Sequence, residues 1–300
     1  MEKLSPKATE EVIYATTPQN LLPPLYSTEE KMKIKIMSHN VWGMYAPDVV
    51  KKVANRNDAM QRIYHRELPD VIGTQEFSAD IRNHKLQDMI ADEYVEVDVT
   101  EDVKALEMEW LYTPMFYRPA TCELIKKGYV LYDRAFNNHD SKGICWAVFK
   151  HIQSGKLFTV CNTHYWWQIG PEHDVARVGN SKDVLRLKAE LPEPFFIMGD
   201  FNCRSSSEAF DVLFSGGLVD VQKVAKDTCD RTTCHPYPGY DEEKGEFFPA
   251  NYSARDFSFA IDHVLVDEAH ADRVLAFDVL IDDDSLSTSD HCPIYVEFDL

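Results

Sequence analysis

Six short segments of the chain place an Asn, Glu, Asp or His at or beside one end of an apolar run, and this pattern most restricts the possible folds. The segments read IKIMSHN, DVIGTQE, FTVCNTH, FFIMGDFN and FAIDH, and STSDH precedes the last apolar run. Apolar runs of this length between turn residues are typical of buried strands. A turn explains one such residue, but Gly, Pro or Ser would serve as well. Because ionisable groups near a core are costly unless they are paired or bind metal, we expect these ends to converge.

Strands and helices alternate from Lys31 to the C-terminus. Strands are expected at 32–40, 69–76, 110–118, 128–133, 143–150, 156–164, 195–202, 259–266, 273–281 and 292–300. Helices are expected at 54–68, 77–90, 172–191 and 206–214, and a long polar and aromatic loop at about 226–257. The pattern predicts one α+β or mixed α/β domain over residues 31–300, with packed sheets and outer helices, preceded by an extension at 1–30.

The charge balance limits the possible partners. The chain has 31 Lys and Arg against 50 Asp and Glu, a formal net charge of −19, and no basic run of five residues. Such a protein repels polyanions at long range, although a local positive groove remains compatible with the sequence. A nucleic-acid substrate is therefore possible but disfavoured, and a small phosphate ester is favoured.

The seven cysteines are scattered, and several lie in apolar runs. This usage favours reduced thiols and a cytoplasmic location over a disulfide framework. Cys229, Cys234 and His235 suggest zinc, but no second pair has the usual spacing, so a zinc site is not expected. The N-terminus lacks a cationic start followed by an apolar stretch, and no run of eighteen apolar residues occurs, so neither a secretion signal nor a membrane span is expected.

The polar residues at the strand ends favour one kind of chemistry. Carboxylate and amide oxygens are hard ligands that suit Mg²⁺ or Mn²⁺ better than zinc. Mg²⁺ is usually held by one or two carboxylates together with water and substrate phosphate oxygens. The sequence therefore indicates phosphoester hydrolysis, in which the metal offsets charge on phosphorus and water is the nucleophile.

The ordered set of motifs resembles the endonuclease/exonuclease/phosphatase superfamily, also called the DNase I-like family. The matching pieces are SHN at 38–40, QE at 75–76, NTH at 162–164, GDFN at 199–202, IDH at 261–263 and SDH at 289–291. Each piece is weak alone, but their order over about 260 residues is specific. The resemblance implies a four-layered α/β/β/α sandwich of two mainly antiparallel sheets flanked by helices.

The resemblance also implies roles for individual residues. Glu76 would be the main Mg²⁺ ligand, with Asn40 and Asp290 as further ligands or water-mediated contacts. The catalytic residues would be Asp200 as general base, Asn202 as the group that holds the attacking water or a phosphate oxygen, His291 on the scissile phosphate, Asp262 orienting His291, and His164 as proton donor or phosphate ligand. For each of these residues a purely structural role is the alternative to the functional one, and this alternative is strongest for His164.

Four residues are candidate substrate contacts. Trp166 and Trp167 follow His164 on an extended segment and face opposite ways, so one is expected in the core and the other beside the site, and Trp166 is the candidate. Tyr117 and Arg118 match a Tyr-Arg pair of the family, and His235 matches a family position before a substrate loop. Residues 236–257 are expected to form a specificity loop.

Three hypotheses about activity follow. The leading one is a Mg²⁺-dependent phosphodiesterase acting on a compact phosphate ester. The second is a nuclease or deadenylase-like exonuclease that acts on single-stranded nucleic acid. The third is an inactive family member that serves as a binding module.

Overall fold

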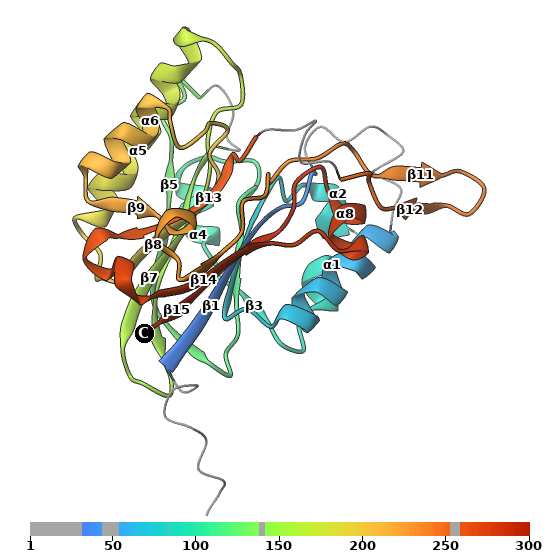
Figure 1. Cartoon of the computed structure of the whole chain (residues 1–300), viewed down its shortest axis with the longest axis horizontal. Helices are drawn as coiled ribbons and strands as arrows, with labels where there is room; N and C mark the ends of the chain where they lie inside the picture. Colours follow the sequence, from blue (N-terminus) through green and yellow to red (C-terminus); the bar gives the residue numbers. More distant parts are fainter. Residues whose placement is uncertain (1–31, 44–53, 84, 138–141, 253–258) are drawn as a thin grey trace, which may run out of the picture.

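The protein is described by a computed structural model that covers residues 32–43, 54–83, 85–137, 142–252 and 259–300 (Figure 1). The predicted extension at 1–30 lies outside these residues. The strands of the first large sheet are β1 (Lys33–Asn40), β2 (Val71–Gln75), β3 (Val95–Glu96), β4 (Met115–Tyr117), β10 (Asp227–Thr228), β14 (Val274–Val279) and β15 (Ile294–Asp299). Those of the second are β5 (Cys122–Leu131), β6 (Gly143–His151), β7 (Leu157–His164), β8 (Phe195–Asp200), β9 (Leu218–Asp220) and β13 (Asp262–Asp267).

The helices are mostly short. They are α1 (Ala54–Glu67), α2 (Ala79–Asn83), α3 (Leu86–Met89), α4 (Thr100–Ala105), α5 (Pro171–Lys188), α6 (Glu208–Ser215), α7 (Val221–Val224) and α8 (Asp283–Thr288), with a 3-10 helix at Glu268–Arg273. Helices α5 and α6 lie on one side of the molecule, whereas α1, α2 and α8 lie on the other side (Figure 1).

The two sheets are mixed, with antiparallel pairs in the majority. The 7-stranded sheet has the order β10-β14-β15-β1-β2-β4-β3, and the 6-stranded sheet has the order β5-β6-β7-β8-β13-β9. Within them β1 runs parallel to β2, and β7 runs parallel to β8. Parallel neighbours bring their carboxyl ends to the same edge, so these two pairs collect the polar residues that end each strand.

The core explains the uninterrupted apolar runs. In β8, Phe196 and Met198 face the other sheet, whereas Phe195 and Ile197 belong to the cluster that packs around Val184 of α5 and Phe210 of α6. A strand covered on both faces has to be apolar throughout. A third cluster joins α1 and α3 to the outer face of the 7-stranded sheet. The resulting four layers confirm the predicted α/β/β/α sandwich.

Some predicted elements differ from those observed. The helix expected at 77–90 is divided into α2 and α3, and Lys85 adopts a left-handed conformation with φ 63°. The strand expected at 110–118 comprises only Met115–Tyr117. The expected loop at 226–257 contains a hairpin of β11 (Gly239–Asp241) and β12 (Glu246–Phe248), while residues 253–258 lie outside the described structure.

All seven cysteines fall within the described residues, and none of them forms a disulfide there. Among the helices of the described ranges, none combines the length and the apolar character needed to cross a membrane.

Candidate active site

Three catalytic candidates lie side by side across the 6-stranded sheet. In the strand register His164 of β7 is paired with Asp200 of β8, and Asp200 is paired with Asp262 of β13. Gly199 makes this alignment possible, because a Cβ atom there would lie 1.9 Å from the carbonyl oxygen of Thr163 on β7. Gly199 also has a φ of 147°, which other residues rarely adopt. The GDFN motif therefore contains a glycine that lets the two strands approach closely.

The 7-stranded sheet supplies the other side of the site. Asn40 ends β1 beside Gln75 of β2, so Glu76 follows directly at the same edge. Trp42, Glu76 and Asn202 all have positive φ values, of 51°, 58° and 50°. Such conformations are uncommon for these residue types and cluster at functional sites. Here they occur where the chain turns away from β1, β2 and β8.

Asp200 lies at the centre of the site and is almost completely buried. Its Oδ2 atom accepts a hydrogen bond from Asn40 Nδ2 at 3.0 Å and lies 3.4 Å from His164 Nε2 and 4.0 Å from His291 Nε2. Burial opposes ionisation, but the positive charges of His291 and Lys142 outweigh it and hold the pKa of Asp200 well below its usual value. Asp200 is therefore a carboxylate at neutral pH and can accept a proton.

His291 is hydrogen-bonded to Asp262. The two side chains lie 2.8 Å apart between Nδ1 and Oδ2, and Thr233 Oγ1 donates to the same carboxylate oxygen at 2.6 Å. Burial alone would lower the pKa of His291, but the Asp262 carboxylate raises it well above the ordinary value. His291 is thus a cation at neutral pH, and its Nε2 side faces Asp200 and the cavity.

The acidic groups fit a hard divalent cation. Glu76, Asp200 and His164 each offer one atom to a cluster of possible ligand atoms, and Asp290 lines the same cavity as the two carboxylates. Burial raises the pKa of Asp290 to about 6; His291 opposes this effect, and the negative charge of Glu76 adds to it. Carboxylates concentrated in this way are the ligand set that Mg²⁺ or Mn²⁺ prefers. Glu76 and Asp290 are the residues that would hold such an ion.

Asn40 lies between the two carboxylates of the site. Its Oδ1 accepts a hydrogen bond from the backbone N–H of Trp42 at 2.9 Å, so its Nδ2 faces Asp200 at 3.0 Å and Glu76 Oε1 at 3.3 Å. In this orientation the amide of Asn40 holds the two carboxylates in position. The predicted role of Asn40 at the metal, as a ligand or through water, stays a prediction.

Lys142 is a site residue that the sequence interpretation missed. It precedes β6, is 1% exposed, and lines the cavity together with Glu76 and Asp200. Its Nζ lies 2.7 Å from His164 Nε2, and burial lowers its pKa to about 8. Burial lowers the pKa of His164, and the positive charge of Lys142 adds to this effect. The imidazole is therefore neutral, and its Nε2 atom accepts a hydrogen bond from Lys142 Nζ. No sequence motif marked Lys142, because a lone lysine before a strand has no distinguishing pattern.

Arg56 of α1 was also missed. It is 2% exposed, and its guanidinium donates to the backbone carbonyl oxygens of Thr288 at 2.8 Å and Val41. These contacts join the end of β1 to the end of α8, which leads into the SDH motif. Arg56 therefore positions the loops that carry Trp42 and Asp290.

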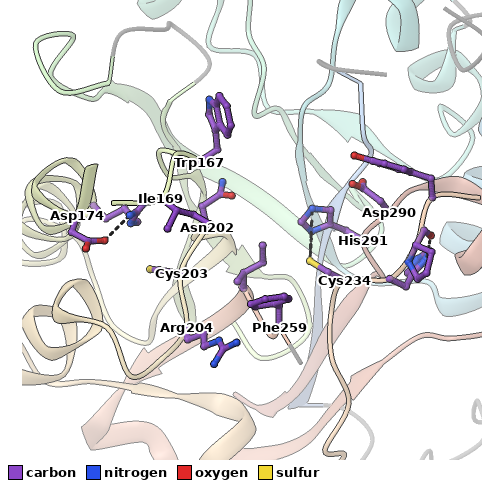
Figure 2. A pocket seen from close by; sticks show the side chains of 15 residues that line it. Trp167, Ile169, Asp174, Asn202, Cys203, Arg204, Cys234, Phe259, Asp290 and His291 are labelled. Carbon is purple, nitrogen blue, oxygen red and sulfur yellow. Dashed lines mark hydrogen bonds and ion pairs between the residues drawn. The ribbon is translucent and has the colours of Figure 1, made fainter. Parts of the chain in front are cut away.

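Two cavities meet at the catalytic residues. The larger, of about 670 Å³, is lined mainly by apolar and aromatic side chains, whereas the smaller, of about 390 Å³, contains Glu76, Lys142 and Asp200. Both cavities are lined by Trp167, Asn202, Tyr237, Asp290 and His291. Figure 2 shows the larger cavity, with Asp290 and His291 on one side and Trp167, Ile169 and Asn202 on the other. A phosphorus atom held beside His291 would thus have space on two sides.

Of the predicted substrate contacts, His235 lines the larger cavity, whereas Trp166 does not. His235 lines the larger cavity, and its backbone N–H donates to the carbonyl oxygen of Asp290 at 3.0 Å. The prediction that Trp166 borders the site is wrong, because this side chain is 5% exposed and its Nε1 donates a hydrogen bond to His173. Trp167, 47% exposed, lines both cavities instead. Because successive side chains of an extended segment face opposite ways, the sequence showed that the two rings point in different directions. It did not show which of them faces the site.

Tyr117 and Arg118 are not at the site. Tyr117 is paired with Val71 at the start of β2, whereas Glu76 follows the far end of that strand. Arg118 forms an ion pair with Glu93 at 3.1 Å. Because the antiparallel pairing of β2 and β4 sends their carboxyl ends in opposite directions, the Tyr-Arg pair lies at the wrong edge of the sheet for phosphate contact.

Comparisons with known proteins agree with this architecture. A sequence model of the Endonuclease/Exonuclease/phosphatase family matches residues 37–291. Two similar solved structures come from Bacteroides thetaiotaomicron, a family protein (TM-score 0.69, 22% identity, covering 89% of this chain and 98% of that one) and the mannosyl-6-phosphatase Bt3783 (0.67, 22%, 88% and 98%). D. rerio TDP2 complexed with single strand DNA product is also similar (0.62, 20%, 89% and 99%). At these identities the structures support the fold alone, and no curated protein sequence matches the chain.

Proposed function

The chain belongs to the endonuclease/exonuclease/phosphatase family, and we propose that it is a Mg²⁺-dependent phosphodiesterase for a compact phosphate ester. Members of this family are hydrolases that act on phosphate esters. The observation that carries the proposal is the pair of cavities that share His291, Asp290 and Asn202 as a common wall. A phosphodiester has two substituents, and each cavity can accept one of them.

In the proposed reaction each residue of the site has a separate role. Asp200, ionised and surrounded by cationic groups, accepts the proton of the attacking water. Asn202 binds the carbonyl oxygen of Tyr165 through Nδ2 at 3.1 Å, which leaves its amide oxygen to orient that water. Cationic His291 and Lys142 stabilise the negative charge that develops on the phosphate oxygens. A divalent cation at Glu76 and Asp290 would supply further charge stabilisation when bound.

The larger cavity favours a flat or apolar substituent. Ile169 is 94% exposed, Tyr237 62% and Phe259 45%, and all three line this cavity. The guanidinium of Arg204 lies 4.7 Å from the ring centroid of Phe259 and can contact a second anionic group of a substrate. Exposed aromatic side chains of this kind stack on planar groups.

His235 forms part of the wall of this cavity. Its Nδ1 atom bonds the carbonyl oxygen of Pro236 at 2.7 Å and therefore carries the proton, while among the described residues Nε2 has no partner. Burial lowers the pKa of His235 to about 4, so the ring is neutral and Nε2 is a hydrogen-bond acceptor. Because Nε2 is itself buried, His235 shapes the wall of the larger cavity and does not present this acceptor to it.

A panel of substrates, with and without EDTA, tests the proposal. We expect hydrolysis of an aryl phosphodiester that EDTA abolishes and Mg²⁺ or Mn²⁺ restores, and slower turnover of the corresponding monoester. Preferred cleavage of the monoester would contradict the assignment as a diesterase. Preferred cleavage of single-stranded oligonucleotides, with a steep dependence on salt, would instead support the nuclease alternative. Mg²⁺ binding without turnover of any ester would indicate an inactive binding module.

Asp200→Asn tests the proposed base directly. The substitution removes the proton acceptor but keeps the size of the side chain, so we expect turnover to fall by about 10²–10⁴-fold. Asp211→Asn, at an exposed position of α6, is the matched control and should leave turnover unchanged. Wild-type turnover in both variants would exclude Asp200 as the base.

A further inference from the structure

Tyr237 lies between the two cavities and lines both of them. Its ring is stacked on Trp42, with 4.7 Å between the ring centroids and an angle of 18° between the ring planes. Of the two cavities, Trp42 lines the smaller one alone. Because Trp42 covers one face of the Tyr237 ring from that side, the larger cavity meets the opposite face, and 62% of Tyr237 is exposed.

Trp42 is a rigid support for this ring. It is 4% exposed, and its backbone N–H donates to Asn40 Oδ1 at 2.9 Å. The guanidinium carbon of Arg56 lies 5.3 Å from the centroid of the Trp42 ring, and Phe247 of the hairpin packs against the same side chain. Tyr237 therefore stacks on a side chain that is already fixed, which lowers the entropic cost of binding a ligand to it.

The Tyr237 ring also lies beside the groups that contact the phosphate in the proposed reaction. Asp290 and His291 line both cavities together with Tyr237. Burial raises the pKa of Tyr237, and the negative charges of Asp290 and Glu76 add to this effect, whereas His291 opposes it. A substituent on a phosphate that contacts His291 therefore lies within reach of the Tyr237 ring.

The apolar lining of the larger cavity does not by itself distinguish a planar substituent from a saturated one. Ile169 and Phe259 offer apolar surface to either kind of group. Apolar burial alone favours a saturated ring over an aromatic ring of the same size, because the saturated ring is more hydrophobic. A supported aromatic face acts in the opposite direction, since a planar ring stacks closely on it and a puckered ring does not.

We propose that Tyr237 selects phosphate esters with an aryl or heteroaromatic substituent, which stacks on the ring face opposite Trp42. The identity of this group as part of a substrate rests on the proposed phosphodiesterase function. Binding of the planar group requires only the larger cavity, the Tyr237 ring and the anion contact at His291.

Phenylphosphonate and cyclohexylphosphonate test the selection, because they carry the same anionic group on a planar and a puckered ring of similar size. Calorimetric titration in the presence of Mg²⁺ should give about tenfold tighter binding of phenylphosphonate to the wild-type protein. Tyr237→Phe keeps the ring and should retain this ratio. Tyr237→Leu should bind the two ligands equally or prefer cyclohexylphosphonate. Equal binding of the two ligands to the wild-type protein would overturn the proposal.

Tyr240→Leu is the matched control, because Tyr240 belongs to β11 and lines neither cavity. This variant should keep the wild-type ratio of affinities. Loss of the ratio in Tyr240→Leu as well as in Tyr237→Leu would overturn direct stacking, since both substitutions would then act through the hairpin.

The binding ratio and the hydrolysis of esters fail separately. If the phosphonates bind with the expected ratio but no ester is hydrolysed, the proposed function fails and the stacking site on Tyr237 stands. If an aryl diester is hydrolysed but Tyr237→Leu keeps the wild-type ratio, the stacking site is overturned and the proposed function stands.

Discussion

At the scale of single residues, the site depends on balanced charges in a buried place. Asp200 remains ionised because the positive charges of His291 and Lys142 lie close to it, despite the cost of burying a carboxylate. Lys142 is the group that the motifs did not indicate. Its ammonium is held by His164 at the edge of the catalytic cavity, so it can contact a phosphate oxygen directly.

Replacing Lys142 tests this contact. Lys142→Met removes the positive charge and should reduce turnover by about 10²-fold, whereas Lys223→Met at an exposed position of α7 should have no effect. Because burial lowers the pKa of Lys142 to about 8, the lysine loses its charge as the pH rises through that value. Wild-type activity should therefore decline above about pH 8, and Lys142→Arg should lose this decline. A profile of turnover against pH that is identical in both proteins would argue against a role for the ammonium.

At the scale of elements, the alignment of β7 with β8 determines where Asp200 lies. Gly199→Ala would introduce a Cβ atom 1.9 Å from the carbonyl oxygen of Thr163 at a φ of 147°. We expect a loss of about 3 kcal/mol or more in the free energy of unfolding, and loss of activity, measured by urea denaturation and turnover. Gly179→Ala in α5, where a Cβ atom meets nothing within 4 Å, is the matched control. It should stabilise the helix by about 0.5–1 kcal/mol; similar effects of the two substitutions would contradict the steric explanation.

At the scale of the whole molecule, Asn162 of β7 joins the two sheets behind the site. Its Oδ1 accepts a hydrogen bond from Gln75 Nε2 at 2.6 Å, and its Nδ2 donates to the carbonyl oxygens of Thr74, Thr113 and Pro114 at 2.8, 3.0 and 3.1 Å. These contacts run from the 6-stranded sheet to β2 of the other sheet and to the segment that leads into β4. The NTH motif thus contributes a bridge between the sheets as well as His164.

Asn162→Ala tests whether this bridge holds the two halves of the site together. Removal leaves buried polar groups of the other sheet without their partner, so we expect the free energy of unfolding to fall by about 2–4 kcal/mol. Chemical denaturation measures the loss, and Asn83→Ala, exposed on α2, is the control. An unchanged unfolding midpoint for Asn162→Ala would show that apolar packing alone aligns the sheets.

The sequence by itself determined the layers of the fold and indicated most of the candidate catalytic residues. Uninterrupted apolar strands have to be covered on both faces, and Asp200, Asp262 and His291 lie at or next to the ends of such strands in a recognisable order. Only the tertiary structure decided at which edge of its sheet each side chain lies, and whether it faces the site. Tyr117 lies at the wrong end of an antiparallel pair, Trp167 and not Trp166 faces the cavities, and Lys142 reaches the site through space. Periodicity and motifs report the neighbours of a residue along the chain, whereas strand direction, burial and long-range packing determine its neighbours in the folded protein.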